Sequence, residues 1–179
     1  MKKKYNQKTN ALTHKITLIS VLVAIGVIIS NVDKKVSSVA FPFLPMAKIG
    51  LANVVILFGV YRFSIVDSLV MTILKSVLVG LIFGSIMSFA IGFTGSLLSF
   101  IAMTVVHRLA KDKVSIIGVS VVGGLFHITG QCLAILLIYQ LGDELMLYGA
   151  LLILFSLVTS ILVGFVSKKT IKYLDMYLK

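Results

Sequence analysis

The sequence contains few charged residues and very few acidic ones. Only 13% of its 179 residues are charged, just six are aspartate or glutamate, and 59% are hydrophobic. A soluble domain of this length needs far more polar surface, which argues strongly against a soluble enzyme. The apolar residues form long blocks separated by short charged segments, a pattern typical of transmembrane helices. We predict an all-α, multi-pass helical bundle in the cell membrane, with residues 1–179 forming a single integral membrane domain.

Cysteine and histidine are also scarce. The single cysteine, Cys132, lies inside an apolar block, so a disulfide or a zinc framework within one chain is excluded. Of the three histidines, His14 and His107 are predicted to lie on the side of the membrane opposite to His127, and no second ligand stands at metal-binding spacing from His127. We therefore expect no metal site and no cofactor.

Basic residues dominate the charge, and their distribution predicts the topology. The formal net charge is +11, but lysine and arginine gather at the ends of the apolar blocks, where they set orientation and contact lipid headgroups. We expect membrane lipids as partners and no nucleic acid. With the N-terminus inside, 13 basic residues are cytoplasmic, Lys75 lies within a span, and three are outside, namely Lys34, Lys35 and Lys48. The positive-inside rule thus places both termini in the cytoplasm.

Six membrane spans fit the hydrophobic pattern. Each is close to the roughly 17–25 residues that cross the hydrocarbon core as a helix, and lipid requires helices because it cannot satisfy open backbone groups. The second span is short, so an arrangement with five spans that merges or drops it stays open. The predicted spans are residues 14–31, 47–62, 64–83, 86–107, 114–140 and 146–167.

Two segments flank this bundle, which covers residues 14–167. Residues 1–13 form a basic cytoplasmic N-terminus, and the run that follows ends without a small-residue cleavage site, so we interpret it as a retained first span. Residues 168–179 form a basic, amphipathic cytoplasmic tail. This tail is either a short helix along the inner membrane surface or a simple charge anchor.

The longest outer connection is residues 32–47, VDKKVSSVAFPFLPMA, which holds both prolines of the chain. Pro42 and Pro45 favour an extended, stiff segment. Because the segment is too apolar to remain in water, we expect it to fold back over the outer mouth of the bundle. It acts there either as a lid over a cavity or as a hydrophobic plug on the helix ends.

Lys75 is the most informative polar residue at membrane depth. It lies about midway along the third predicted span, where a lysine costs about 3 kcal/mol on insertion scales. Asp67 lies eight residues earlier in the same span, too far along a helix to pair directly, and no acidic residue is predicted at the depth of Lys75 in another span. The pattern favours an anionic ligand or a water-filled cavity, with pairing to carbonyls or helix ends as the alternative.

Further polar residues are predicted at a similar depth. His127 and Gln131 share one helical face because they are four residues apart. Lys48 stands at the outer rim of the second span and Asn53 lies five residues deeper. Together with Lys75 these residues come from three spans and indicate an outward-facing polar pocket. For His127, a hydrogen bond between helices is the alternative.

Four stretches that contain these residues resemble a known family. FPFLPMAKIGLAN, LKSVLVGLIFG, GFTGSLLSFIAM and SVVGGLFHITGQ occur in this order, with spacings similar to those of the Gx transporter family, also described as heptaprenyl diphosphate synthase component I. The resemblance covers roughly residues 12–165. Members of this family look like the substrate-binding S-components of energy-coupling factor (ECF) transporters, which implies six helices, cytoplasmic ends and a ligand pocket open to the outside.

The resemblance also implies roles for the pocket residues. Lys48 and Asn53 match the family's K-x-G-L-A-N stretch, Lys75 matches its basic position in the third span, and His127 and Gln131 match its H-x-x-x-Q pair. These five residues are the predicted substrate-binding set.

The partners that the resemblance implies are a transmembrane coupling subunit and a pair of ATPases. S-components generally dock the coupling subunit through a small-x-x-x-small face on the first span, often Ala-x-x-x-Ala. This chain has Ser20 and Ala24 at that spacing, which still allows close helix approach.

The catalytic meaning of the family description can be tested against the sequence. Prenyl chain elongation needs magnesium held by clustered aspartates, whereas only Asp143 and Glu144 are adjacent acidic residues here. The chain also lacks a G-x-x-x-x-G-K-[ST] ATPase motif. We therefore predict a protein that is not an enzyme: a substrate-binding subunit for a small polar or anionic molecule, vitamin-like or a precursor. The alternative is a noncatalytic membrane scaffold of a heptaprenyl diphosphate synthase in the isoprenoid and menaquinone pathway.

Overall fold

A computed structural model describes residues 2–40, 42, 48–83, 85–110, 113–140 and 143–177, with side chains described from residue 12 in the first helix and over residues 149–173 in the last. These residues form helices and no strand, which confirms the predicted all-α class. The helices are α1 (Lys2–Ala40), α2 (Asn53–Arg62), α3 (Ile65–Phe83), α4 (Ile86–Ala110), α5 (Ile116–Tyr139) and α6 (Asp143–Tyr177).

Five of these helices, all except α2, contain an apolar stretch long enough to cross a membrane. This agrees with the predicted multi-pass membrane protein. Helix α2 has only 10 residues, so it is about 15 Å long, roughly half of the hydrocarbon core. The prediction of a full helical span over residues 47–62 is therefore wrong. The segment before α2 is non-helical at residues 48–50 and turns at residues 51–52.

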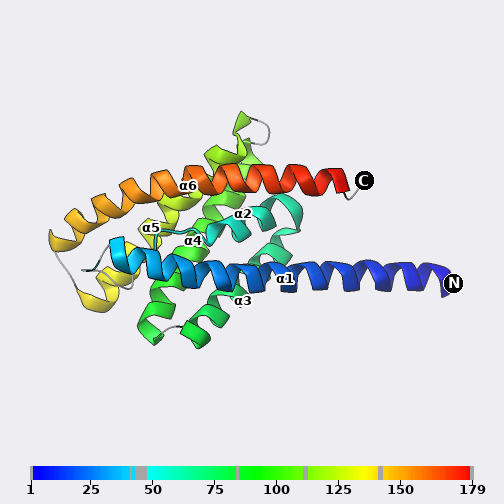
Figure 1. Cartoon of the computed structure of the whole chain (residues 1–179), viewed down its shortest axis with the longest axis horizontal. Helices are drawn as coiled ribbons and strands as arrows, with labels where there is room; N and C mark the ends of the chain where they lie inside the picture. Colours follow the sequence, from blue (N-terminus) through cyan, green and yellow to red (C-terminus); the bar gives the residue numbers. More distant parts are fainter. Residues whose placement is uncertain are drawn as a thin grey trace.

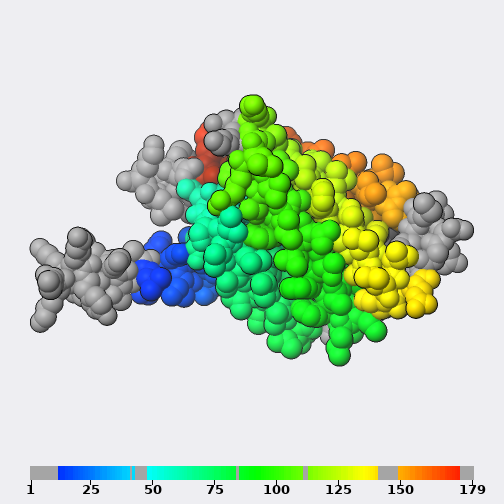
Figure 2. Space-filling view, turned by 180° about the vertical axis from the view of Figure 1, so that it is seen from behind, coloured from blue at the N-terminus to red at the C-terminus, as the bar shows by residue number. Residues whose placement is uncertain are grey.

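Helix α2 is nevertheless the centre of the bundle, since it contacts all five other helices. Figure 1 shows it between the long helices α1 and α6, with the start of α1 and the end of α6 toward the same side of the molecule. From behind, α4 runs across the face of the bundle and α1 projects beyond it (Figure 2). The main hydrophobic core forms around α2 and consists of Ile56, Leu57, Val60, Phe100, Met103, Val119 and Val163.

Helix α1 continues well beyond its predicted end at residue 31. It stops at Ala40, so the predicted outer loop 32–47 is wrong in its first half. The helix ends two residues before Pro42. A proline disfavours helical backbone at the residue that precedes it. Pro42 itself is an exposed turn residue. The choice between lid and plug depends on residues 41 and 43–47, which lie outside the described residues.

Helix α6 also runs further than predicted. It continues without a break through Gly164 to Tyr177, so residues 168–177 extend α6 and do not form a separate surface helix. A Cβ atom at Gly164 would lie 2.8 Å from the Cα of Ile117 on α5. The glycine therefore allows a close approach of two helices and does not end one of them.

Candidate functional site

The non-helical segment at residues 48–50 lies inside the bundle, where its backbone groups need partners. Asp33 on α1 supplies two of them: its Oδ1 accepts a hydrogen bond from the backbone N–H of Ile49 at 3.1 Å, and its Oδ2 accepts one from Gly50 at 3.0 Å. The Oγ atom of Ser37, one turn further along α1, also accepts from the Ile49 N–H at 3.1 Å. Asp33 is only 1% exposed. The carboxylate of Asp33 therefore links the non-helical segment at residues 48–50, called the broken segment below, to α1.

Two other helices hold the same segment. The side-chain amide of Gln131 on α5 accepts from the Lys48 N–H at 2.8 Å and donates to the Lys48 carbonyl at 2.7 Å. Thr159 on α6 donates to the Ile49 carbonyl at 3.3 Å. Side chains from three helices thus replace the hydrogen bonds that a continuous helix would have made. Gly50 follows with a φ of +96°, a conformation that favours glycine.

A narrow cavity lies beside this segment, between α1, α2, α3, α4 and α5. Its volume is about 20 Å³, room for about one water molecule. Four of the five predicted binding residues line it: Lys48, Asn53, Lys75 and His127. Gln131 does not line it, since its amide bonds to the Lys48 backbone. Further lining residues are Ser30, Asp33, Gly50, Ala52, Ser76, Val79, Phe89, Gly92, Phe93 and Ser96.

Lys75 reaches into this cavity from α3 and is 4% exposed. Its Nζ donates to the Oγ of Ser96 on α4 at 3.2 Å. The aliphatic part of its side chain lies against Gly26 on α1, where an added Cβ would be 3.1 Å from Cγ of Lys75. Asp33 interacts electrostatically with it. The expectation of no acidic residue at this depth is therefore wrong, although no carboxylate of the described residues forms a close ion pair with Lys75.

Lys48 brings a second cation to the same cavity. It is 8% exposed, and its ammonium lies against α4, where a Cβ added at Gly92 would be 2.8 Å from the Nζ atom. Asp33 attracts Lys48 as well as Lys75, and the two lysines repel each other. Two buried cations therefore share one buried carboxylate, which leaves the lined cavity with a formal charge of +1.

Two lining residues have hydrogen-bonding capacity to spare. Neither ring nitrogen of His127 makes a hydrogen bond of good geometry with the described residues, and the Oδ1 atom of Asn53 also has none. His127 is packed against Gly50 and Gly95, the positions at which an added Cβ would meet its ring at 3.3 Å and 3.1 Å. Among the described residues the imidazole has a hydrogen-bonding interaction only with the backbone of Gly95, and the amide oxygen has no hydrogen-bond partner, an arrangement that favours a water molecule or a ligand.

The small residues of the first span, Ser20 and Ala24, are both exposed. They lie four residues apart on α1 and therefore on one helical face. The structure leaves this face open on the outside of the bundle.

Sequence reasoning missed Asp33, the residue that organises the site. The hydrophobic pattern predicts an outer loop at Asp33, because the charged residues Asp33, Lys34 and Lys35 follow the first apolar run. The signal that favours a helix is the absence of glycine and proline between residues 27 and 41. Such a run allows the helix to continue to the turn at Pro42.

The chain is similar to a known protein family over most of its length. The family model for heptaprenyl diphosphate synthase component I matches residues 22–170. No curated protein and no solved structure matches the chain. The matched region contains all of the residues that line the cavity or hold the broken segment. This multi-pass helical membrane protein therefore belongs to the heptaprenyl diphosphate synthase component I family.

Proposed function

We propose that the protein is a membrane substrate-binding subunit of the S-component type, which takes up a small anionic or strongly polar molecule from the outside. The observation that carries this proposal is the pair of buried lysines, Lys48 and Lys75, which share the single carboxylate of Asp33 in one cavity. Ionisable groups at membrane depth are costly, and they are typical of substrate and ion pathways.

The charge balance favours an anion. A buried cation without a full counter-charge is destabilising, and a bound carboxylate or phosphate would supply the missing negative charge. His127 and Asn53 add groups that can donate to and accept from the same ligand. Lys48, Lys75, Asn53 and His127 are therefore the proposed contact residues, and Gln131 is proposed to position Lys48.

The cavity must widen to admit such a ligand, because it now has room for about one water molecule. The aromatic rings of Phe89 and Phe93 on α4 form part of its wall and stack at a centroid distance of 5.5 Å. We therefore interpret the structure as a closed state of a binding site.

Energy for transport would have to come from other proteins. The chain has no phosphate-binding ATPase motif, so a transmembrane coupling subunit and a pair of ATPases are the proposed partners. The exposed face that carries Ser20 and Ala24 supports this proposal, since small residues allow another helix to approach closely.

A second candidate function follows from the family description. A noncatalytic membrane component could hold a soluble heptaprenyl diphosphate synthase at the membrane. The chain would supply no catalysis, because it has no aspartate cluster that could hold magnesium. This candidate does not account for two buried lysines in a cavity, which is why we favour the first.

Gentle affinity purification from native membranes, with mass spectrometry of the co-eluting proteins and small molecules, tests both candidates. We expect a coupling protein with two ATPases, and a small molecule that is retained by the wild type and by Lys35→Met but lost from Lys75→Met. Lys35 is an exposed lysine of α1 and serves as the matched control. Recovery of a soluble prenyl diphosphate synthase without the ATPases would decide for the second candidate.

A further inference from the structure

An apolar groove adjoins the narrow cavity around Lys48 and Lys75, called the lysine cavity below. The groove lies where α3 ends and α4 begins, and its volume is about 440 Å³, within the range of roughly 300–1,000 Å³ that is usual for small-molecule sites. Its lining residues carry no charge, and only one of them has a polar side chain. They are Val77, Gly80, Leu81, Ser85, Ile86 and Phe89.

One side chain, that of Phe89 on α4, belongs to both spaces. It lines the groove as well as the lysine cavity, and it is half-buried. Its ring lies on Gly80 of α3, where an added Cβ would be 2.5 Å from the Cδ2 atom of the ring. The missing side chain at Gly80 thus provides the space that this ring occupies. A rotation of the Phe89 side chain would join the groove to the lysine cavity and supply the room that the lysine cavity lacks.

The groove is open on the outside of the bundle. Leu81 and Ile86 line it and are 77% and 85% exposed. Exposed apolar side chains of a multi-pass membrane protein face the hydrocarbon of the lipid. In the predicted topology this end of α3 and α4 is the outer one. A ligand with an apolar part can therefore reach the groove from the outer half of the bilayer.

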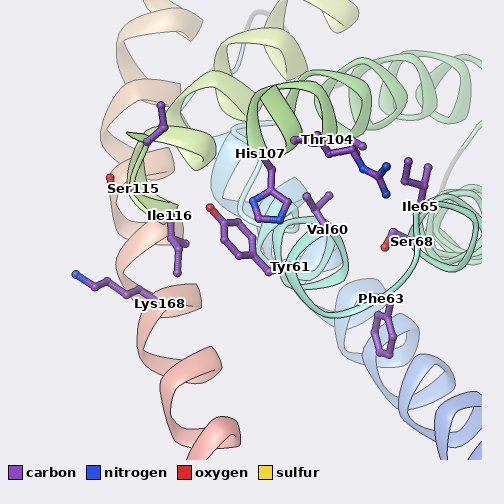
Figure 3. A pocket seen from close by; sticks show the side chains of 12 residues that line it. Val60, Tyr61, Phe63, Ile65, Ser68, Thr104, His107, Ser115, Ile116 and Lys168 are labelled. Carbon is purple, nitrogen blue, oxygen red and sulfur yellow. The ribbon is translucent and has the colours of Figure 1, made fainter. Parts of the chain in front are cut away.

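A larger cavity at the other end of α3 provides no comparable route to the lysines. It has a volume of about 870 Å³ and lies where α2 ends and α3 begins. The rings of Tyr61 and His107 lie against each other inside it, with centroids 4.1 Å apart (Figure 3). It shares no lining residue with the lysine cavity. Of these two spaces, the groove is therefore the one that adjoins Lys48 and Lys75.

The charge and the size of the lysine cavity restrict the anionic part of the ligand. Lys48, Lys75 and Asp33 together give the cavity a formal charge of +1. A single negative charge balances it, whereas the second charge of a phosphate monoester would be buried without a partner. A carboxylate is also flat and small, which suits a cavity with room for about one water molecule. These two properties favour a monocarboxylate.

We propose that the ligand of the lysine cavity is an amphiphilic monocarboxylate, whose carboxylate binds Lys48 and Lys75 and whose compact apolar body lies in the groove. The ligand enters from the side, between α3 and α4, as the Phe89 side chain rotates. The proposal rests on the proposed substrate-binding function and adds the class of the substrate to it. A small hydrophilic anion would leave the groove unused, whereas an apolar body would be removed from water there.

The test is a fluorescence titration of the purified full-length protein in detergent, with naphthoate as the probe. The chain contains no tryptophan, so the naphthalene signal has no tryptophan background. Naphthamide lacks the charge of the probe, naphthyl phosphate carries a phosphate in place of the carboxylate, and acetate, used as a competitor, lacks the apolar body. A titration of detergent alone corrects for partition into micelles.

Two variants separate the head of the ligand from its body. Lys75→Met removes one cation, and Lys35→Met is its control because Lys35 is exposed on α1. Val77→Phe fills the groove without changing the charge. Its control is Val70→Phe, since Val70 is an exposed valine of the same helix that lines neither space. Cooperative thermal unfolding shows that each variant is folded.

We expect the wild type and both controls to bind naphthoate more tightly than naphthamide, naphthyl phosphate or acetate. Lys75→Met and Val77→Phe should each weaken the binding of naphthoate by about tenfold or more. In stopped-flow measurements, Phe89→Ala should bind and release the probe faster than the wild type, because the side chain that has to rotate is gone. An unchanged association rate would overturn the route past Phe89.

The other outcomes distinguish this proposal from the proposed function. Acetate that binds as tightly as naphthoate, or Val77→Phe that binds naphthoate as well as Val70→Phe does, would overturn the role of the groove and leave the lysine site in place. Tighter binding of naphthyl phosphate would overturn the carboxylate class alone. Unchanged binding by Lys75→Met would overturn the proposal together with the lysine site. Absence of any binding would overturn the proposal, while the small molecule recovered from native membranes still decides on the proposed function.

Discussion

Gln131 and Lys48 form a reciprocal pair of hydrogen bonds across 83 residues of sequence, in which the side-chain amide of Gln131 bonds to both the N–H and the carbonyl of Lys48. The side-chain amide of Gln131 thus makes the same two hydrogen bonds that a neighbouring backbone segment would make with Lys48. It fixes the depth at which Lys48 enters the bundle. The lysine's ammonium can reach the cavity because its backbone is held by α5.

Replacing Gln131 with leucine should destabilise the protein strongly. The apolar side chain would leave a buried N–H and a buried carbonyl of Lys48 without partners, and each unsatisfied group costs about 1–3 kcal/mol. We expect the free energy of unfolding in detergent to fall by roughly 2–6 kcal/mol. Thr129→Val is the control, since Thr129 lies on the exposed face of α5 and bonds only within its helix. A fall no larger than that of the control would mean that the Lys48 backbone finds other partners.

Replacing Asp33 with asparagine should also destabilise the protein, for a different reason. The amide keeps one acceptor for the Ile49 and Gly50 N–H groups, but it leaves Lys48 and Lys75 without a negative charge between them. We expect a loss of about 3–5 kcal/mol, the usual cost of breaking a buried charge arrangement. Denaturation of Asp33→Asn, of Lys48→Met and of the double variant gives the coupling free energy. Additive losses would show that Asp33 does not stabilise the protein through the charge of Lys48.

The long helices in the middle of the chain could be predicted from sequence because their limits are marked. Helix α3 begins after the charged turn at Arg62, and α4 and α5 are separated by the basic segment near residue 111. Predicted and observed ends differ there by at most a few residues. Apolar blocks with charged punctuation are local signals, and local signals suffice for such helices.

The non-helical segment before α2 could not be predicted in the same way. Residues 48–50 leave the helical pattern because Asp33, Gln131 and Thr159 satisfy their backbone groups. The partner nearest in sequence is Asp33, which is 16 positions from Ile49. A hydropathy window records only that this segment is apolar, so it predicts a longer helix than the fold contains.

Four of the five predicted residues line one cavity, and the reason that they could be singled out is physical. Lys48, Asn53, Lys75 and His127 stand out in sequence because polar groups at membrane depth are costly, and the structure brings all four to one cavity. Asp33 is not singled out in this way, because a carboxylate next to two lysines at the end of an apolar run is predicted to be exposed to water. Its burial depends on the tertiary contacts of α1 with the segment before α2.

Replacing Lys75 with methionine should stabilise the protein without ligand. Methionine keeps most of the packing against Gly26 and removes one of two cations, so that Lys48 and Asp33 then balance each other. Replacement of buried ionic groups by apolar side chains often gains about 1–4 kcal/mol, and the removal of the excess cation here should give a gain at the lower end of that range. The expected change in the free energy of unfolding thus has the opposite sign to that for Asp33→Asn. Thermal unfolding of the ligand-free protein in detergent measures this change.

The same variant should lose the small molecule that the wild type retains, because the ligand's negative charge would have one cation fewer to bind. Stability and ligand retention would then move in opposite directions, as is common for functional residues. A Lys75→Met protein that is less stable and still retains the ligand would make Lys75 a structural residue.

Replacing Gly92 with alanine should affect ligand binding more than stability. The new Cβ would lie 2.8 Å from the Nζ of Lys48, the far end of a flexible side chain, so the ammonium can shift at little cost to folding. We expect a change in unfolding free energy within about 1 kcal/mol and a clear loss of ligand retention. Gly149→Ala is the matched control, because its Cβ would make only an ordinary contact, 3.7 Å from the Sγ of Cys132.

Gly124→Ala should lower the stability of the bundle more than ligand binding, the reverse of what we expect for Gly92→Ala. Comparison of the two variants therefore separates packing from binding. Its Cβ would lie 2.9 Å from the Cβ of Ser160, which forces α5 and α6 apart and should cost about 1–3 kcal/mol. If Gly92→Ala retained the ligand as well as Gly149→Ala does, the ammonium of Lys48 would have no part in binding. If it lost the ligand while Gly124→Ala kept it at a lower melting temperature, the position of one ammonium group, and not the rigidity of the bundle, would determine what the cavity holds.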